Sequence, residues 1–278
     1  MKSLHVSLHA AQSAARMRQG RSHVRPARRS AKREGGTRIA RMLNSVRNRE
    51  VSRLEGFSDA VFGFALTLLV VSLETPKDVA GLRNMVGSFL PFGITFAMVS
   101  WIWYQHNLFF RRYDLQDAWT AFLNCVLLFV VLFYVFPLKF LTLTLVGRFT
   151  MSGEEIPRMA NLTGPLVMTI YSTGVLVIFG TFVMLHLHAW RKRHELDLSP
   201  VDEVVLQYST RAHMLSAGLA VVSLILVALL PRQTAWAGII YALMGPLHGW
   251  NGYKGGQAQA RIKERELAVA LNGDKPVA

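Results

Sequence analysis

The chain has 278 residues, of which 51% are hydrophobic and 17% are charged. This balance is typical of a protein that spans a membrane, and it argues against a water-soluble globular protein. The net charge of +14 is concentrated near the beginning of the chain, because 14 of the 31 Lys and Arg residues fall between Met1 and Arg53. The basic character therefore belongs to an amino-terminal segment and not to the fold.

Residues 1–45 have no aromatic side chain and no sustained apolar periodicity, so we expect a disordered basic tail there. Such a tail can bind the anionic headgroups of membrane lipids, whereas no specific nucleic-acid partner is predicted. Two other interpretations stay open: an organelle transit peptide, whose Arg-rich and acid-poor composition is similar, and a start codon upstream of the true one. The single cysteine, Cys125, excludes a disulfide within one chain.

Six stretches of the chain meet or approach the roughly 20 apolar residues that a membrane-spanning helix needs. In chain order they are Leu54–Leu73, Met85–Tyr104, Trp119–Phe140, Leu162–Leu187, Met214–Leu230 and Ala235–Trp250. The connections between them are short and polar, so no soluble domain fits between the spans. We therefore predict an all-α polytopic membrane protein, with a six-helix transmembrane domain at 46–252 and a polar tail at 253–278.

Lys and Arg also predict the orientation of the chain. They are more frequent in the segments on the side of the membrane that holds the amino terminus, and cytoplasmic loops carry such an excess. We therefore expect a multi-pass protein of the cell inner (cytoplasmic) membrane with both termini in the cytoplasm.

The first span begins with polar residues. A helix that started at Ala60 would have only 14 residues before it ended at Leu73, which is too short to cross a bilayer. The helix must therefore begin near Leu54, which brings Ser58 and Asp59 into the span or its boundary. An ionisable group at that depth is costly unless it is paired, hydrated or near a helix end. Asp59 is therefore a functional candidate.

Two interpretations of Asp59 stay open. It can cap the amino-terminal turn of the helix, where the helix dipole favours a negative charge. Alternatively it binds a side chain from another helix, because Arg53 lies about 120° away around the helix axis and cannot form an ordinary ion pair with it. The candidate partners are His106, at the end of the second span, and Asn124, early in the third.

The helical period of about 100° per residue divides the first span into two faces. The residues on one face are Arg53, Phe57, Ala60, Phe64, Thr67, Leu68 and Val71, and those broadly on the other are Ser58, Asp59, Phe62, Leu66 and Leu69. One helix therefore has two different surfaces to present.

The sequence from Arg53 to Asp59, an Arg followed after three residues by Phe-Ser-Asp, resembles the first helix of the transmembrane protein 175 family of potassium channels. Trp103–Phe109, Leu123-Asn124 and Phe136-Pro137 match the same family in the second and third spans. The similarity covers roughly residues 51–250 and is to the bacterial single-repeat type.

This resemblance implies a homotetramer in which the first helices line a pore for potassium ions, with no cofactor and no metal site. It implies a pore face formed by Phe64, Thr67, Leu68 and Val71. It also implies a motif and gating network formed by Arg53, Phe57, Ser58, Asp59, Trp103, His106 and Asn124. The chain departs from the family at Phe64, where isoleucine is usual at the constriction.

Other interpretations of these residues and of the function stay open. Thr67 can bond to its own helix, and Asn124 can serve helix packing alone. The same fold is compatible with a proton-conducting protein, a secondary transporter or a non-conducting family member. A membrane enzyme would need a metal site, for which the candidate ligands are His186, His188, His106 and His194. It is not expected, because His186 and His188 are two residues apart and do not share one helix face.

Overall fold

The computed structural model describes residues 52–73, 75–150 and 164–272, with side chains at 52–73, 75–146 and 164–268. The predicted tail at 1–45 lies outside the described residues. Every regular element within the described part is a helix. The helices are α3 (Arg53–Val71), α4 (Val79–Gly87), α5 (Phe89–Tyr113), α6 (Ala118–Thr150), α8 (Pro165–Arg191), α9 (Pro200–Leu229), α10 (Ala235–Ile239), the 3-10 helix η1 (Ile240–Leu243) and α11 (Met244–Asn272).

Within the described residues, five helical segments are long and apolar enough to cross a membrane. They are Arg53–Val71, Val79–Tyr113, Ala118–Val146, Pro165–Arg191 and Pro200–Leu229. The all-α, multi-pass membrane fold is thereby confirmed. The sixth predicted span, Ala235–Trp250, is also helical, but it is divided into α10, η1 and the first turns of α11, which continues to Asn272.

Several helices are longer than the apolar stretches that predicted them. The second span was expected to end at Tyr104, but α5 continues to Tyr113 and stops where Asp114 takes a left-handed conformation with φ 46°. α9 begins at Pro200, well before the expected Met214, because Ser199 caps it by accepting a hydrogen bond from the amide of Asp202 at 3.1 Å. Caps and backbone conformation set these ends, and hydropathy does not detect them.

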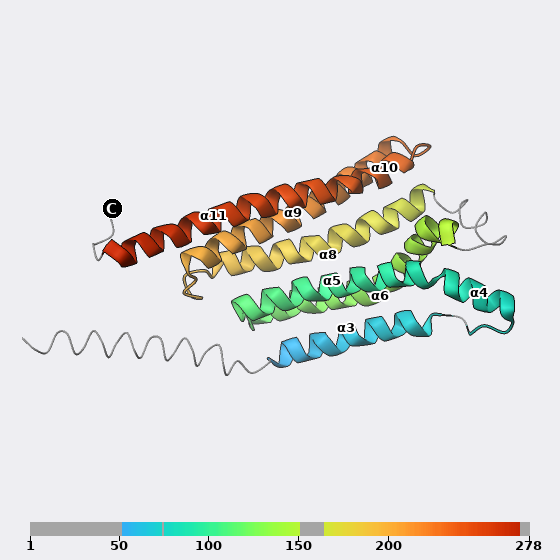
Figure 1. Ribbon diagram of the computed structural model, residues 1–278, viewed down its shortest axis with the longest axis horizontal. Helices are drawn as coiled ribbons and strands as arrows, with labels where there is room; N and C mark the ends of the chain where they lie inside the picture. Colours follow the sequence, from blue (N-terminus) through green and yellow to red (C-terminus); the bar gives the residue numbers. More distant parts are fainter. Residues whose placement is uncertain (1–51, 74, 151–163, 273–278) are drawn as a thin grey trace, which may run out of the picture. The chain divides into compact units, whose positions relative to one another are not determined.

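The long helices pack side by side in a defined order (Figure 1). α3 packs against α5 and α6, α6 packs against α8, and the most extensive contact joins α8 to α9. α11 packs against α9 and lies at the edge opposite α3 in Figure 1. α3 is therefore covered by other helices on one side only.

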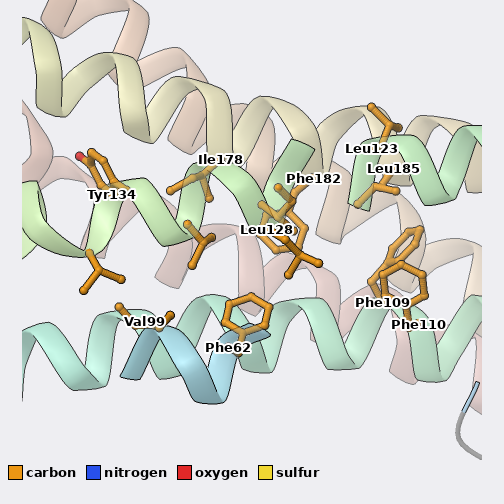
Figure 2. Packing of buried hydrophobic residues seen from close by; sticks show 14 of the residues in the cluster. Phe62, Val99, Phe109, Phe110, Leu123, Leu128, Tyr134, Ile178, Phe182 and Leu185 are labelled. Carbon is orange, nitrogen blue, oxygen red and sulfur yellow. The ribbon is translucent and has the colours of Figure 1, made fainter. Parts of the chain in front are cut away.

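Apolar side chains from α3, α5, α6 and α8, together with Leu206 of α9, form the core (Figure 2). Phe62 and Leu69 of α3 are 2% and 0% exposed. At another point Gly174 of α8 allows Tyr134 of α6 to approach closely, because a Cβ on Gly174 would lie only 2.0 Å from the tyrosine ring. The hydroxyl of Tyr134 donates a hydrogen bond to the carbonyl oxygen of Tyr171 at 2.7 Å. These contacts fix α6 against α8, and α6 in turn packs against α3.

Candidate functional site

A chain of buried hydrogen bonds joins α3, α6 and α5. The Nδ2 of Asn124 donates to the Oγ of Ser58 at 2.9 Å, and the Oδ1 of Asn124 lies 2.7 Å from the Nε2 of His106. Ser58 and Asn124 are fully buried, and His106 is 1% exposed. One amide therefore bonds to side chains of two other helices, as the resemblance implied for these three residues.

The chemistry of these groups fixes the direction of each bond. The Oγ of Ser58 donates to the carbonyl oxygen of Leu54 at 2.7 Å, so it accepts from Asn124. The carbonyl oxygen of the Asn124 amide can only accept, so the Nε2 of His106 carries a hydrogen and donates to it. The Nδ1 of His106 is buried without a hydrogen-bond partner among the described residues. The rings of Phe62 and Phe110 lie beside the imidazole, at centroid distances of 5.5 Å and 4.5 Å.

Asp59 has a different partner from those that the sequence predicted. The Nε1 of Trp103 donates to the Oδ1 of Asp59 at 2.8 Å, and Asp59 itself is exposed. The expectation of a partner from another helix holds, but the choice of His106 or Asn124 was wrong. Asp59 lies about 100° around the helix from Ser58, so it faces the edge of α5 where Trp103 lies and not the buried amide.

Arg53 and Phe57, the other motif residues, are exposed at the beginning of α3, and Phe57 is 56% exposed. Around the helix axis Phe57 lies about 100° and Arg53 about 140° from Ser58, so neither faces the buried amide. The structure therefore brings together five of the seven residues of the expected network, as one chain of Ser58, Asn124 and His106 and one pair of Asp59 and Trp103.

The residues of the expected pore face lie on the uncovered side of α3. Phe64 is 58% exposed and Val71 is 74% exposed; Thr67 is also exposed, and Leu68 is half-buried. The hydroxyl of Thr67 donates to the carbonyl oxygen of Gly63 at 2.9 Å, so in the single chain it bonds to its own helix. This surface is available to another molecule.

A lysine that the sequence analysis did not single out holds the other end of α3. The Nζ of Lys139 in α6 donates to the carbonyl oxygen and to the Oγ of Ser72, at 2.6 Å and 2.9 Å. A cation at this position meets the carbonyl groups that a helix leaves unpaired at its carboxyl end. In the sequence, Lys139 is a lone charge inside the apolar run of the third span, and such a charge indicates a functional or structural role. α6 therefore binds α3 near both ends.

A second polar cluster joins the beginning of α6 to the end of α8. The Oδ1 of Asp117 accepts hydrogen bonds from the amides of Trp119 and Thr120, each at 3.0 Å. Its Oδ2 lies 2.8 Å from the Nε2 of His188 and 3.4 Å from the Nζ of Lys192. Burial opposes ionisation, but these hydrogen bonds and positive charges hold the pKa of the Asp117 carboxyl well below its ordinary value.

The pair His186-x-His188 thus serves two separate contacts. The Nδ1 of His186 lies 2.8 Å from the carbonyl oxygen of Phe182 inside the core, whereas His188 faces Asp117. The two imidazoles do not share a coordination site, as their spacing indicated. Within the described ranges no group of three or more His, Cys, Asp or Glu side chains is placed to hold a metal ion.

Comparison with known proteins gives a consistent result. Residues 53–134 match a family model described as endosomal/lysosomal potassium channel TMEM175, and this segment contains all residues of the expected network and pore face. The chain is 36% identical over 214 residues to a protein of Marivirga tractuosa named potassium channel. The aligned region covers 73% of this chain and 87% of the relative. It is 32% identical over 104 residues to a potassium channel of Chamaesiphon minutus, and this aligned region covers 34% of this chain and 51% of the relative.

The fold is also similar to a solved structure. It is the crystal structure of a variant of the potassium channel MtTMEM175 in complex with a nanobody–MBP fusion protein. The sequence of that channel is 34% identical to this chain. The similarity covers 76% of this chain and 96% of that one, with a TM-score of 0.66.

Proposed function

We propose that this chain, which belongs to the TMEM175 family of potassium channels, conducts potassium ions through a pore lined by α3 in a homotetramer. The family membership confirms the resemblance inferred from the Arg53–Asp59 motif. The relatives are named as channels and not as enzymes.

The observation that carries the proposal is the division of α3 into two surfaces. Ser58 and Phe62 are buried against the neighbouring helices, while Phe64, Thr67 and Val71 are exposed on the other side. Hydrogen bonds from Asn124 and Lys139 hold the helix so that this second surface stays outward. Symmetric copies can therefore bring four such surfaces around one axis.

The chemistry of the exposed face suits an ion pathway that is narrowed by apolar side chains. Rings of Phe64, Leu68 and Val71 would restrict passage by size and by expelling water, because an apolar constriction gates a pore by dewetting. Thr67 would add a layer of hydroxyl groups, which can replace part of the hydration shell of a cation. No cofactor is required, and potassium is the permeant species.

Phe64 decides how restrictive this pore is. Phenylalanine fills more space than the isoleucine expected at this position from the family resemblance. Four phenyl rings at one level can close the pathway more completely than four aliphatic side chains. We therefore assign the narrowest constriction to Phe64, in a protein of the cytoplasmic membrane with both termini in the cytoplasm.

The test is ion flux into liposomes that contain the purified full-length chain. We expect potassium to pass faster than sodium, and Phe64→Ile to raise the potassium flux by about an order of magnitude if the ring sets a barrier of about 1.4 kcal/mol. Phe129→Ile is the matched control, because Phe129 is an exposed phenylalanine of α6 at 72%. It should leave the flux unchanged.

Two results would contradict this proposal. The first is the absence of potassium flux in both the wild-type protein and Phe64→Ile. The second is flux of protons alone, which would favour a proton-conducting member of the same fold. The mass of the detergent-solubilised complex provides a separate check, since it should correspond to four copies.

A further inference from the structure

α9 and α11 are antiparallel, and their contacts fix which residues lie at the same level. The Oγ of Ser216 lies 2.9 Å from the Nε2 of His248, and further along the Nδ2 of Asn251 donates to the carbonyl oxygen of Tyr208 at 2.9 Å. A Cβ on Gly255 would lie 3.0 Å from the Cγ of Tyr208. The ring of Tyr208 on α9 therefore packs directly against α11 at Gly255.

Two cationic side chains lie at this level, one on each helix. The guanidinium of Arg211 lies over the ring of Tyr208, with 5.3 Å from Cζ to the ring centroid. Lys254 is the residue before Gly255, which faces the same ring. Both cations are exposed. Arg211 and Lys254 therefore lie at nearly the same level of the helix pair, and together they are called the cationic surface.

This cationic surface has no acidic side chain beside it in sequence. No Asp or Glu lies within four residues of Arg211 or of Lys254, so neither has an acidic neighbour one turn away on its own helix. A pair of exposed cations without such neighbours favours an external anion.

The surroundings place this surface at the edge of the membrane. On α9 the exposed residues that follow Arg211 toward the carboxyl end of the helix are apolar, as with Met214 at 53% and Ile225 at 49%. From Arg211 to Leu229 the helix rises about 27 Å, close to the thickness of the hydrocarbon core. Trp250 and Tyr253, on the same stripe of α11 as Lys254, are 54% and 64% exposed, as is usual at headgroup depth.

We propose that Arg211 and Lys254 bind the phosphate of an anionic phospholipid headgroup, with Trp250 and Tyr253 against the upper part of its acyl chains. The lipid lies in the leaflet on the side where α3 begins. This inference rests on the proposed function in one respect. If α3 lines the pore, α11 at the opposite edge faces lipid and not another copy.

The test uses the full-length protein in mixed vesicles of phosphatidylglycerol and phosphatidylcholine, with either lipid brominated in its acyl chains. Bromine quenches tryptophan fluorescence at short range, and subtracting the signal of Trp250→Phe isolates Trp250 among the six tryptophans. At equal bromine content we expect the quenching to correspond to a binding constant for phosphatidylglycerol about fivefold above that for phosphatidylcholine. The double variant Arg211→Gln/Lys254→Gln should bring this ratio close to one.

The control is Lys263→Gln/Arg265→Gln, which removes the same charge from exposed positions further along α11 and should keep the preference. Equal quenching by the two lipids in the wild-type protein would overturn the inference, and so would a preference that survives Arg211→Gln/Lys254→Gln. Neither readout depends on ion flux. A protein that prefers phosphatidylglycerol but passes no potassium would contradict the proposed function alone.

Discussion

The Nδ2 of Asn124 donates a hydrogen bond to the Oγ of Ser58 at 2.9 Å, and both side chains are fully buried. Because the same amide accepts from His106, any movement of α3 relative to α5 and α6 must break or rearrange a buried polar contact. Leaving such a group unpaired costs more than the bond itself contributes. A shift of the proposed pore helix would therefore meet resistance at this contact.

Asn124→Ala should destabilise the protein more than Ser58→Ala. The asparagine variant loses both bonds of the amide and leaves the buried Nε2–H of His106 without its acceptor, at a cost of about 1–3 kcal/mol. Ser58→Ala leaves the Nδ2–H of Asn124 without its acceptor but keeps the bond between Asn124 and His106, so its cost should lie near the lower end of this range. Thermal unfolding of the detergent-solubilised complex measures both variants. The opposite ranking would show that the amide is not the central group of this network.

Gly174→Ala should be destabilising because the new methyl group would collide with the ring of Tyr134, at 2.0 Å from its Cε2. The ring or α8 must move, and overpacking of this kind typically costs about 1–3 kcal/mol. Gly180→Ala is the matched control on the same helix, because nothing lies within 4 Å of its added Cβ. Equal thermal midpoints for the two variants would contradict the close packing of α6 on α8.

The sequence predicted these helices better than it predicted their contacts. The apolar runs located the spans, since about 20 apolar residues are required wherever a helix crosses lipid. The periodicity of the first span also separated Ser58 and Phe62 from Phe64 and Thr67, and the structure has them on the buried and exposed sides of α3. Local pattern was sufficient for these features.

Contacts between helices depend on rotation and depth, which a linear pattern does not contain. Asp59 and Ser58 are neighbours in sequence, yet they bond to Trp103 and Asn124 on different helices. Lys139 was counted only as part of an apolar span, although it bonds to the end of α3. Both partners become evident only when the packing of α5 and α6 against α3 is known.

The pair of Asp117 and His188 predicts a dependence of stability on pH. The pKa of Asp117 is lower in the folded protein than in the unfolded chain. Its ionised form therefore stabilises the fold above about pH 4, and this contribution is lost as the pH falls below that value toward the folded pKa. Asp117→Asn should lower the thermal midpoint at pH 7, and the difference from the wild type should shrink between about pH 5 and pH 2. A difference that stays constant over this range would contradict the assignment.

The most direct test of the proposed pore is the access of silver ions to position 67. Cys125 is the single cysteine and is exposed, so its replacement by alanine provides a background without thiols. Silver is a small monovalent cation that binds thiolate, and it can reach a residue in the middle of α3 only along a water-filled path. In liposomes, Thr67→Cys in this background should lose most of its potassium flux when silver is added. The parent and Phe129→Cys on α6 should be unaffected. Potassium flux through Thr67→Cys that persists in silver would contradict a pore lined by the exposed face of α3.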